Sequence, residues 1–197
     1  MDTVKTDFSS LEGTCCYCSA ESSGQIRAAL ACVPLRALHL LGTGDYHYVS
    51  LFYLERITVP FELLLYDHHP DDQPAAFGGA LLSCGSWVLH ARRLPMLKAS
   101  YHISSMESMR QVPSSGLPIY MSVDLDILSE EYMHTDWDQG EMSLGELLSS
   151  LGSICAGREI LGADLCGGLT MSRGATEEDI FLNSRAYKAV EDFFLPL

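Results

Sequence analysis

The residues of this sequence best suited to chemistry are aspartates and histidines that follow short apolar runs. Asp67, His69 and Asp71 come directly after the apolar run 61–66. Residues two positions apart in an extended chain point to the same side, so these three side chains are expected to converge while His68 points away. One imidazole flanked by two carboxylates is a ligand set that suits Mn, Zn or Fe ions. For this cluster alone, an acidic surface turn is an equally good interpretation.

A second pair of carboxylates, Asp124 and Asp126, follows the apolar run 118–123 at the same alternating spacing. A solvated strand terminus would be the simpler interpretation of this pair by itself. Ligands of open α/β sheets bind outside the carboxyl ends of the strands, and both clusters are expected at such ends. The loop that follows the run 36–41 can bring His47 to the same edge. Three elements at three strand ends favour one shared site over three unrelated turns.

The charges of these residues also favour a metal site. The four aspartates of the two clusters carry four negative charges when ionised, which two divalent cations would balance. The two neutral histidines, His47 and His69, would then complete the ligand shells. Without metal, four carboxylates converging in one pocket would repel one another, and some would have to be protonated. We therefore expect the working protein to hold metal in this pocket.

These clusters need a sheet that brings the ends of several strands together. Short apolar runs bounded by polar or turn residues alternate with helix-like segments, which predicts one three-layer α/β/α domain over residues 1–197 with a mainly parallel sheet. Strands are expected at 36–41, 61–66, 118–123 and 159–165. Helices are expected over 48–56, after a capping box of Ser143 and Glu146, and from Thr176 to about Phe194.

The composition limits the classes of partner. The 197 residues have 47% hydrophobic content and a formal net charge of −14, from 26 acidic against 12 basic residues. A strongly negative surface repels phosphate backbones, so no nucleic-acid partner is expected. Residues 1–10 do not resemble a signal peptide, and no apolar stretch is long enough to span a bilayer. We expect a soluble, cytoplasmic protein that acts on a small molecule away from the membrane.

The seven cysteines are odd in number and irregularly spaced, which predicts reduced thiols. The group Cys15-Cys16-Tyr17-Cys18 lacks the second pair that a zinc site needs, so a buried, reduced strand is expected there. Cys84 lies near the expected pocket and is a candidate nucleophile or proton donor. The ordinary alternative is that Cys84 is a small core residue.

The three motifs, in this order, resemble those of the arginase, agmatinase and formiminoglutamase family (ureohydrolases). That family has Gly-Gly-Asp-His, then Asp-Ala-His-x-Asp, then Ser-x-Asp-x-Asp. The matching segments here are Gly44-Asp45-Tyr46-His47, with an extra Tyr46, then Asp67-His68-His69-Pro70-Asp71 and Ser122-Val123-Asp124-Leu125-Asp126. The resemblance extends loosely over 35–194 and includes the short, uncharacterised members of the family. It implies an arginase/deacetylase-like fold.

The resemblance also implies a binuclear centre with two Mn²⁺ ions, for which Zn²⁺ or Fe²⁺ are substitutes. One ion would take His47, Asp67, Asp71 and Asp124, and the other would take Asp67, His69, Asp124 and Asp126. Two cations lower the pKa of a bound water, and the resulting nucleophile would attack an sp² carbon of a guanidinium or amide group. Asp126 is counted with Cys84 among the catalytic candidates. Family members often assemble as trimers or hexamers, so a homo-oligomer is one expectation.

The sequence departs from the family pattern in its substrate apparatus. The histidine used for proton transfer is missing from 82–87, and the first histidine afterwards is His90. The glutamate with which the family binds guanidinium would fall near Gly167, in the segment Asp164-Leu165-Cys166-Gly167-Gly168, which has no glutamate. We therefore predict a metal-dependent hydrolase of non-peptide carbon–nitrogen bonds rather than an arginase itself. Two alternatives stay open: a zinc deacetylase using Asp67, His69 and Asp124, and a metal-binding relative without catalysis.

Overall fold

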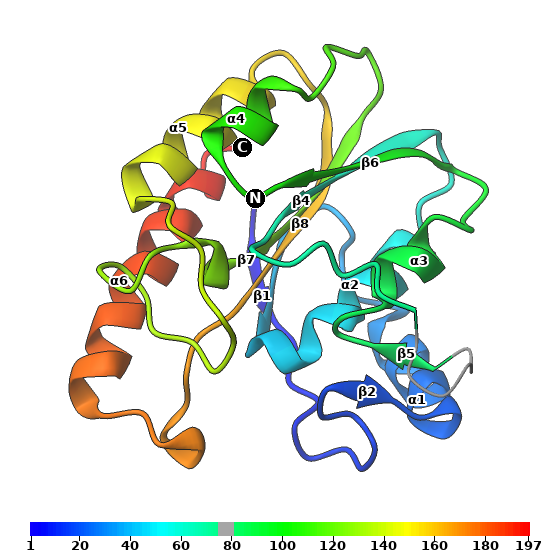
Figure 1. Cartoon of the computed structure of the whole chain (residues 1–197). Helices are drawn as coiled ribbons and strands as arrows, with labels where there is room; N and C mark the ends of the chain where they lie inside the picture. Colours follow the sequence, from blue (N-terminus) through cyan, green and yellow to red (C-terminus); the bar gives the residue numbers. More distant parts are fainter. Residues whose placement is uncertain (75–80) are drawn as a thin grey trace.

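The computed structural model describes residues 1–74 and 81–197, and it is built around one sheet of six parallel strands (Figure 1). The strand order across the sheet is β1-β3-β8-β7-β4-β6. The bounds are β1 Thr3–Lys5, β3 Leu38–Gly42, β4 Phe61–Tyr66, β6 Leu97–Ile103, β7 Ile119–Asp124 and β8 Ile160–Cys166. A short antiparallel pair, β2 Tyr17–Cys18 and β5 Leu82–Ser83, lies apart from this sheet.

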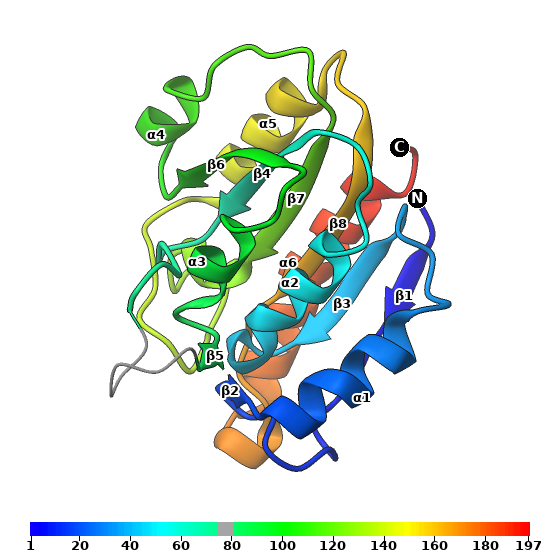
Figure 2. The same ribbon diagram turned by 90° about the vertical axis from the view of Figure 1, so that its right-hand side faces the viewer.

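Helices cover both faces of the large sheet, which gives the three-layer α/β/α arrangement predicted from the sequence (Figures 1 and 2). One face carries α1 Ala20–Leu30, α2 Ser50–Leu54 and α3 Trp87–Ala91, and the other carries α4 Met106–Arg110, α5 Leu144–Cys155 and α6 Glu177–Phe194. Each face has its own buried apolar cluster. Because both faces are covered, all six residues of β4 and of β7 are buried, as expected for strands that are continuous apolar runs.

The predicted elements are mostly found, with shifted ends. β4 has the predicted bounds, and β3, β7 and β8 each end one residue beyond the predicted run. The helix predicted over 48–56 is instead a 3₁₀ turn, η1 Gly44–Val49, followed by the short α2. The capping box predicted at Ser143 and Glu146 is present, and α6 ends at the predicted Phe194. No helix of the described residues is long and apolar enough to cross a membrane.

The prediction for residues 15–18 was partly wrong. Only Tyr17 and Cys18 form a strand, and Cys18 is buried, but Cys15 is exposed on the preceding loop. The thiols of Cys15 and Cys16 instead approach the carboxylate of Asp45. All seven cysteines are free, as the odd count predicted.

The carboxyl ends of β3, β4, β7 and β8 meet at one edge of the sheet, and α6 fixes part of that edge. The hydroxyl of Tyr187 lies 2.9 Å from the carbonyl oxygen of Gly42 and 2.6 Å from that of Gly167. These glycines follow the buried parts of β3 and β8. One phenol therefore holds two neighbouring strand ends in fixed positions.

We predict that Tyr187→Phe lowers the free energy of unfolding by about 1–3 kcal/mol, because the one phenol proton that the two carbonyl oxygens share is lost. Urea unfolding followed by circular dichroism measures this change. Tyr132→Phe is the control, since the described residues offer its hydroxyl no hydrogen bond. Equal stability of the Tyr187 and Tyr132 variants would contradict the proposed clamp.

Candidate metal centre

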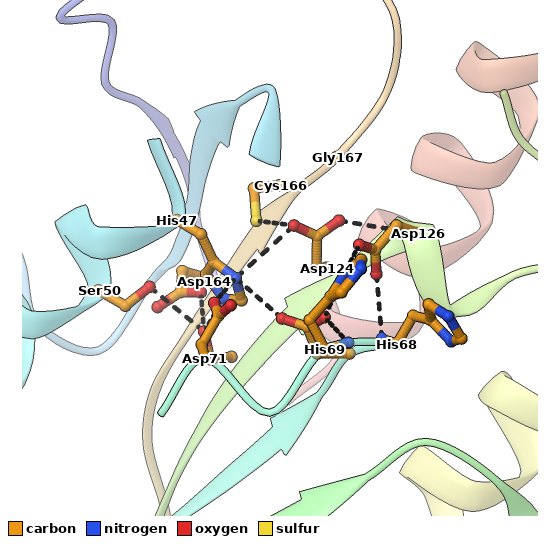
Figure 3. A network of polar contacts seen from close by, with 12 residues as sticks. His47, Ser50, His68, His69, Asp71, Asp124, Asp126, Asp164, Cys166 and Gly167 are labelled. Carbon is orange, nitrogen blue, oxygen red and sulfur yellow. Dashed lines mark hydrogen bonds and ion pairs between the residues drawn. The ribbon is translucent and has the colours of Figure 1, made fainter. Parts of the chain in front are cut away.

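The six side chains predicted from the three motifs come together at the carboxyl edge of the sheet (Figure 3). Two groups of three have their nitrogen and oxygen donor atoms within 4.8 Å of one another. The first is His47, Asp67 and Asp71, and the second is Asp67, His69 and Asp126. Asp67 belongs to both groups, so the two groups are adjacent parts of one cluster.

His47, on η1, lies at the centre of the carboxylates. Its Nδ1 atom is 3.1 Å from Asp67 Oδ2, 3.1 Å from Asp71 Oδ2 and 3.6 Å from Asp124 Oδ2. Its other nitrogen, Nε2, is 2.8 Å from the hydroxyl of Ser122, which donates to Asp164 Oδ1 at 2.6 Å. The ring is therefore oriented from behind by Ser122 and Asp164, and Nδ1 faces the acids.

The segment after β4 reaches the site by a turn rather than as extended chain. Asp71 has a φ of 47°, in the left-handed region, so the predicted alternation does not continue through this residue. Asp71 nevertheless joins the cluster, and the indole nitrogen of Trp87 donates to its Oδ2 at 2.7 Å. The side chain of His68 is exposed and points away, as expected (Figure 3).

The segment after β7 also turns. Asp124 ends the strand, and Asp126 lies in the 3₁₀ turn η3 Leu125–Ile127, so their common orientation does not come from extended alternation. The backbone nitrogen of Asp126 donates to Asp124 Oδ1 at 3.0 Å. The Oδ2 atom of Asp126 lies 2.9 Å from Nδ1 of His69. The turn thereby aims one carboxylate at each histidine.

Several groups of the cluster have pKa values above their ordinary ones and therefore favour the protonated form. Burial, and then the neighbouring Asp126 and Asp67, raise the pKa of Asp124 well above its ordinary value. Burial of His47 opposes its charge, but contacts with Cys166, Asp67 and Asp71 outweigh burial and hold its pKa well above the usual value. Hydrogen bonds that His69 donates to Asp126 and Asp67 raise its pKa to about 10.

Two residues of the site were not predicted from the sequence. Cys166, the last residue of β8, is fully buried, and its thiol lies 3.1 Å from Asp124 Oδ2. Gly167 has a φ of 102°, and a Cβ atom there would lie 2.6 Å from Asp124 Oδ1. The backbone therefore leaves no room for a side chain at Gly167, where the family resemblance places a glutamate.

A cavity of about 370 Å³ opens onto the cluster. It is lined by the six cluster residues together with Cys16, Tyr17, Gly44, Gln73, Ser83, Cys84, Gly85 and Trp137. Burial chiefly raises the pKa of Cys84 to about 12, which favours the neutral thiol and hence a proton donor over a nucleophile. The catalytic role of Cys84 stays a prediction. Among these residues, His47 and His69 are the only histidines.

The donor set of the cluster fits divalent cations. It combines carboxylates and imidazoles, the types that bind Mn, Fe and Zn ions. The four aspartates are at most 6% exposed, and buried carboxylates this close require a compensating positive charge. The two imidazoles can supply at most two positive charges, and no lysine or arginine of the described residues lies within 4.0 Å of these four carboxylates.

No family model matches the chain. An uncharacterized protein of Thermotoga maritima is 33% identical over 141 residues, which cover 64% of this chain, and the chain spans only 56% of that relative. Among solved structures, proclavaminate amidino hydrolase from Streptomyces clavuligerus has a TM-score of 0.67 at 14% identity, over 89% of this chain and 71% of its own. Formimidoylglutamase from Bacillus subtilis has a TM-score of 0.65 at 13% identity, over 88% of this chain and 66% of its own. Arginase from Bacillus caldovelox has a TM-score of 0.64 at 15% identity, over 89% of this chain and 75% of its own.

The chain has the fold of the arginase (ureohydrolase) family. The resemblance inferred from the three motifs is thus confirmed at the level of the fold. Within this arginase fold, the motif residues lie at the carboxyl ends of the strands, where open α/β sheets bind their ligands. The ligand roles of the individual residues stay a prediction.

We predict that Gly167→Ala weakens Mn²⁺ binding by about tenfold or more, because its methyl group displaces Asp124. Gly157→Ala is the matched control. Gly157 also has a positive φ, 76°, but nothing lies within 4 Å of the position that an added methyl group would take. Both variants share a strain of about 1–2 kcal/mol from the positive φ, and Gly167→Ala adds the clash with Asp124 and Leu125, so urea unfolding should show the larger destabilisation for Gly167→Ala. Calorimetric titration with Mn²⁺ separates them, and equal affinities would contradict the contact with Asp124.

We further predict that Mn²⁺ affinity rises with pH over about pH 6–8, by about tenfold per pH unit for each proton released. The raised pKa values of His47 and His69 mean that the ion-free cluster is protonated in this range, and a cation displaces those protons. Titrations in buffers of different ionisation enthalpy count the protons. An affinity that does not change with pH would argue against binding at these histidines.

Proposed function

We propose that the chain is a metal-dependent hydrolase of carbon–nitrogen bonds other than peptide bonds, with two divalent cations in the cluster. The observation that carries this proposal is the pair of adjacent donor groups that share Asp67, at the carboxyl edge of an arginase-type sheet. From the family resemblance, Mn²⁺ is the expected ion, with Zn²⁺ or Fe²⁺ as substitutes.

The proposed ligand sets are those that the family resemblance implies, and they add Asp124 to each of the two groups. One ion would be held by His47, Asp67, Asp71 and Asp124, and the other by Asp67, His69, Asp124 and Asp126. Cations bound there lower the pKa of water and polarise the group under attack. The protein supplies the orientation, because Ser122 fixes the ring of His47 and Trp87 fixes the carboxylate of Asp71.

The cavity supports a small-molecule substrate. Its volume of about 370 Å³ lies in the range of small-ligand sites, about 300–1,000 Å³. No lysine or arginine is among its described lining residues, so a free carboxylate on the substrate finds no lysine or arginine to pair with there. A compact guanidino or amide compound, with the reacting carbon directed at the cluster, is the substrate class that fits best.

A metal-binding protein without catalysis is the second candidate, and one observation favours it. Gly167 stands where the resemblance places the glutamate that binds guanidinium, and its surroundings admit no side chain. The zinc deacetylase alternative ranks lower, because Asp71 and Asp126 lie within the cluster and supply more donors than a single ion needs.

We predict that protein loaded with Mn²⁺ holds about two ions per chain, as required for a binuclear hydrolase site. Elemental mass spectrometry after gel filtration measures this content. His69→Ala and Asp124→Asn should each lose metal, since each removes a donor of the cluster. His68→Ala is the matched control, because the exposed neighbouring imidazole lies outside the cluster. Absence of bound metal in the wild type would overturn the proposal, and about one zinc ion would favour the deacetylase alternative.

The loaded protein should release urea, ammonia or an amine from at least one compound in a panel of guanidino and amide substrates. Asp124→Asn should abolish that release while His68→Ala keeps it. Two bound ions without turnover of any compound would favour the non-catalytic candidate.

A further inference from the structure

The thiol of Cys166 lies beside the cluster of aspartates and histidines. Its sulfur, the Oδ2 atom of Asp124 and a ring nitrogen of His47 all lie within 4.8 Å of one another. All three residues are at most 3% exposed. Figure 3 shows the sulfur directed at the carboxylate of Asp124, on the side of the cluster occupied by His47.

We propose that Cys166 is a ligand of the ion at His47, and that this half of the centre therefore prefers a thiophilic cation such as Zn²⁺, Fe²⁺ or Co²⁺ to Mn²⁺. This inference rests on the proposed metal site. It adds a sulfur donor to a ligand set otherwise made of carboxylates and imidazoles.

The position of Cys166 follows from the geometry of β8. Side chains two apart on a strand share one face, so Asp164 and Cys166 point the same way. Asp164 reaches the Nε2 side of His47 through Ser122, and Cys166 reaches the opposite side, near Asp124. Gly167 then allows the chain to pass against Asp124 without a Cβ atom. Asp164 and Cys166, on one face of β8, are thus both directed toward the cluster of aspartates and histidines.

The other buried cysteine provides a comparison. Both thiols belong to the same buried apolar cluster, and the thiol of Cys18 donates to the backbone oxygen of Ser19 at 3.6 Å. The thiol of Cys166 instead contacts a carboxylate that is itself a proposed metal ligand. A core thiol needs no such partner, so the contact points to a role in the cluster.

The chemistry of the donors decides the preferred ion. Thiolate sulfur is a soft ligand that binds Zn²⁺ well, whereas oxygen ligands suit Mn²⁺. Mn²⁺ also stands lowest in the affinity order of the first-row divalent ions. When sulfur binds the ion, the proton of the thiol leaves to solvent, and the thiolate adds one negative charge next to the cation.

Titration of the metal-free protein with Co²⁺ tests this inference, because a thiolate ligand gives a sulfur-to-cobalt charge-transfer absorption in the near ultraviolet. We expect this band in the wild type and its loss in both Cys166→Ser and Cys166→Ala. Cys84→Ser, at a thiol that lines the cavity outside the donor groups, should keep the band. Unfolding curves check that both Cys166 variants are folded, and serine keeps the shape of the side chain.

Competition between Zn²⁺ and Mn²⁺ gives an independent readout. The preference for Zn²⁺ over Mn²⁺ should fall in Cys166→Ser by roughly 10–100-fold or more. Loss of an outer partner of a metal site alone costs roughly 10–100-fold in metal affinity, and a direct ligand should cost at least as much.

Co²⁺ binding without the band, or an unchanged metal preference in the variant, would overturn the role of Cys166 and leave the two-ion proposal intact. A band lost in Cys15→Ser/Cys16→Ser instead would place the sulfur ligand beside Asp45 and also overturn the inference. Absence of any metal binding would overturn both proposals together.

Discussion

Four carboxylates, each at most 6% exposed, lie together at one edge of the sheet, and their mutual repulsion is the constraint that the surrounding structure has to satisfy. Charges removed from water need a partner of opposite sign, and burial makes an unpaired carboxylate costly. In this chain the partners inside the cluster are two imidazoles, which can carry at most two positive charges. A cluster with this composition is suited to divalent cations, and its shape is explained most simply by them.

The rest of the structure holds that arrangement in place. Parallel strands bring His47, Asp67 and Asp124 to one edge, because their carboxyl ends all point the same way. A second layer of polar groups then fixes each ligand, as Ser122 does for His47 and Trp87 does for Asp71. Such outer partners set the orientation and basicity of metal ligands. The helices matter mainly because they bury this edge and clamp the strand ends.

The sequence predicted the fold and the six side chains that come together, because buried strands and their polar ends leave a strong local pattern. It missed both edge strands, β1 and β6, and in β6 the residues Lys98, Ser100 and His102 interrupt any apolar run. It also assumed extended chain where Asp71 adopts a left-handed φ and where η3 turns the chain at Asp126, because such conformations depend on tertiary contacts. Cys166 escaped notice because one cysteine in an apolar strand has the same pattern as a core residue.

The most direct test of the central claim is anomalous X-ray diffraction from crystals of the protein loaded with Mn²⁺, and then with Zn²⁺, each measured at the absorption edge of its metal. The account predicts two neighbouring anomalous peaks, with His47 and Asp71 beside one, His69 and Asp126 beside the other, and Asp67 between them. Crystals in which the ordered aspartate cluster shows no anomalous peak under saturating metal would contradict the account. The aspartates would then be a structural feature of the strand ends.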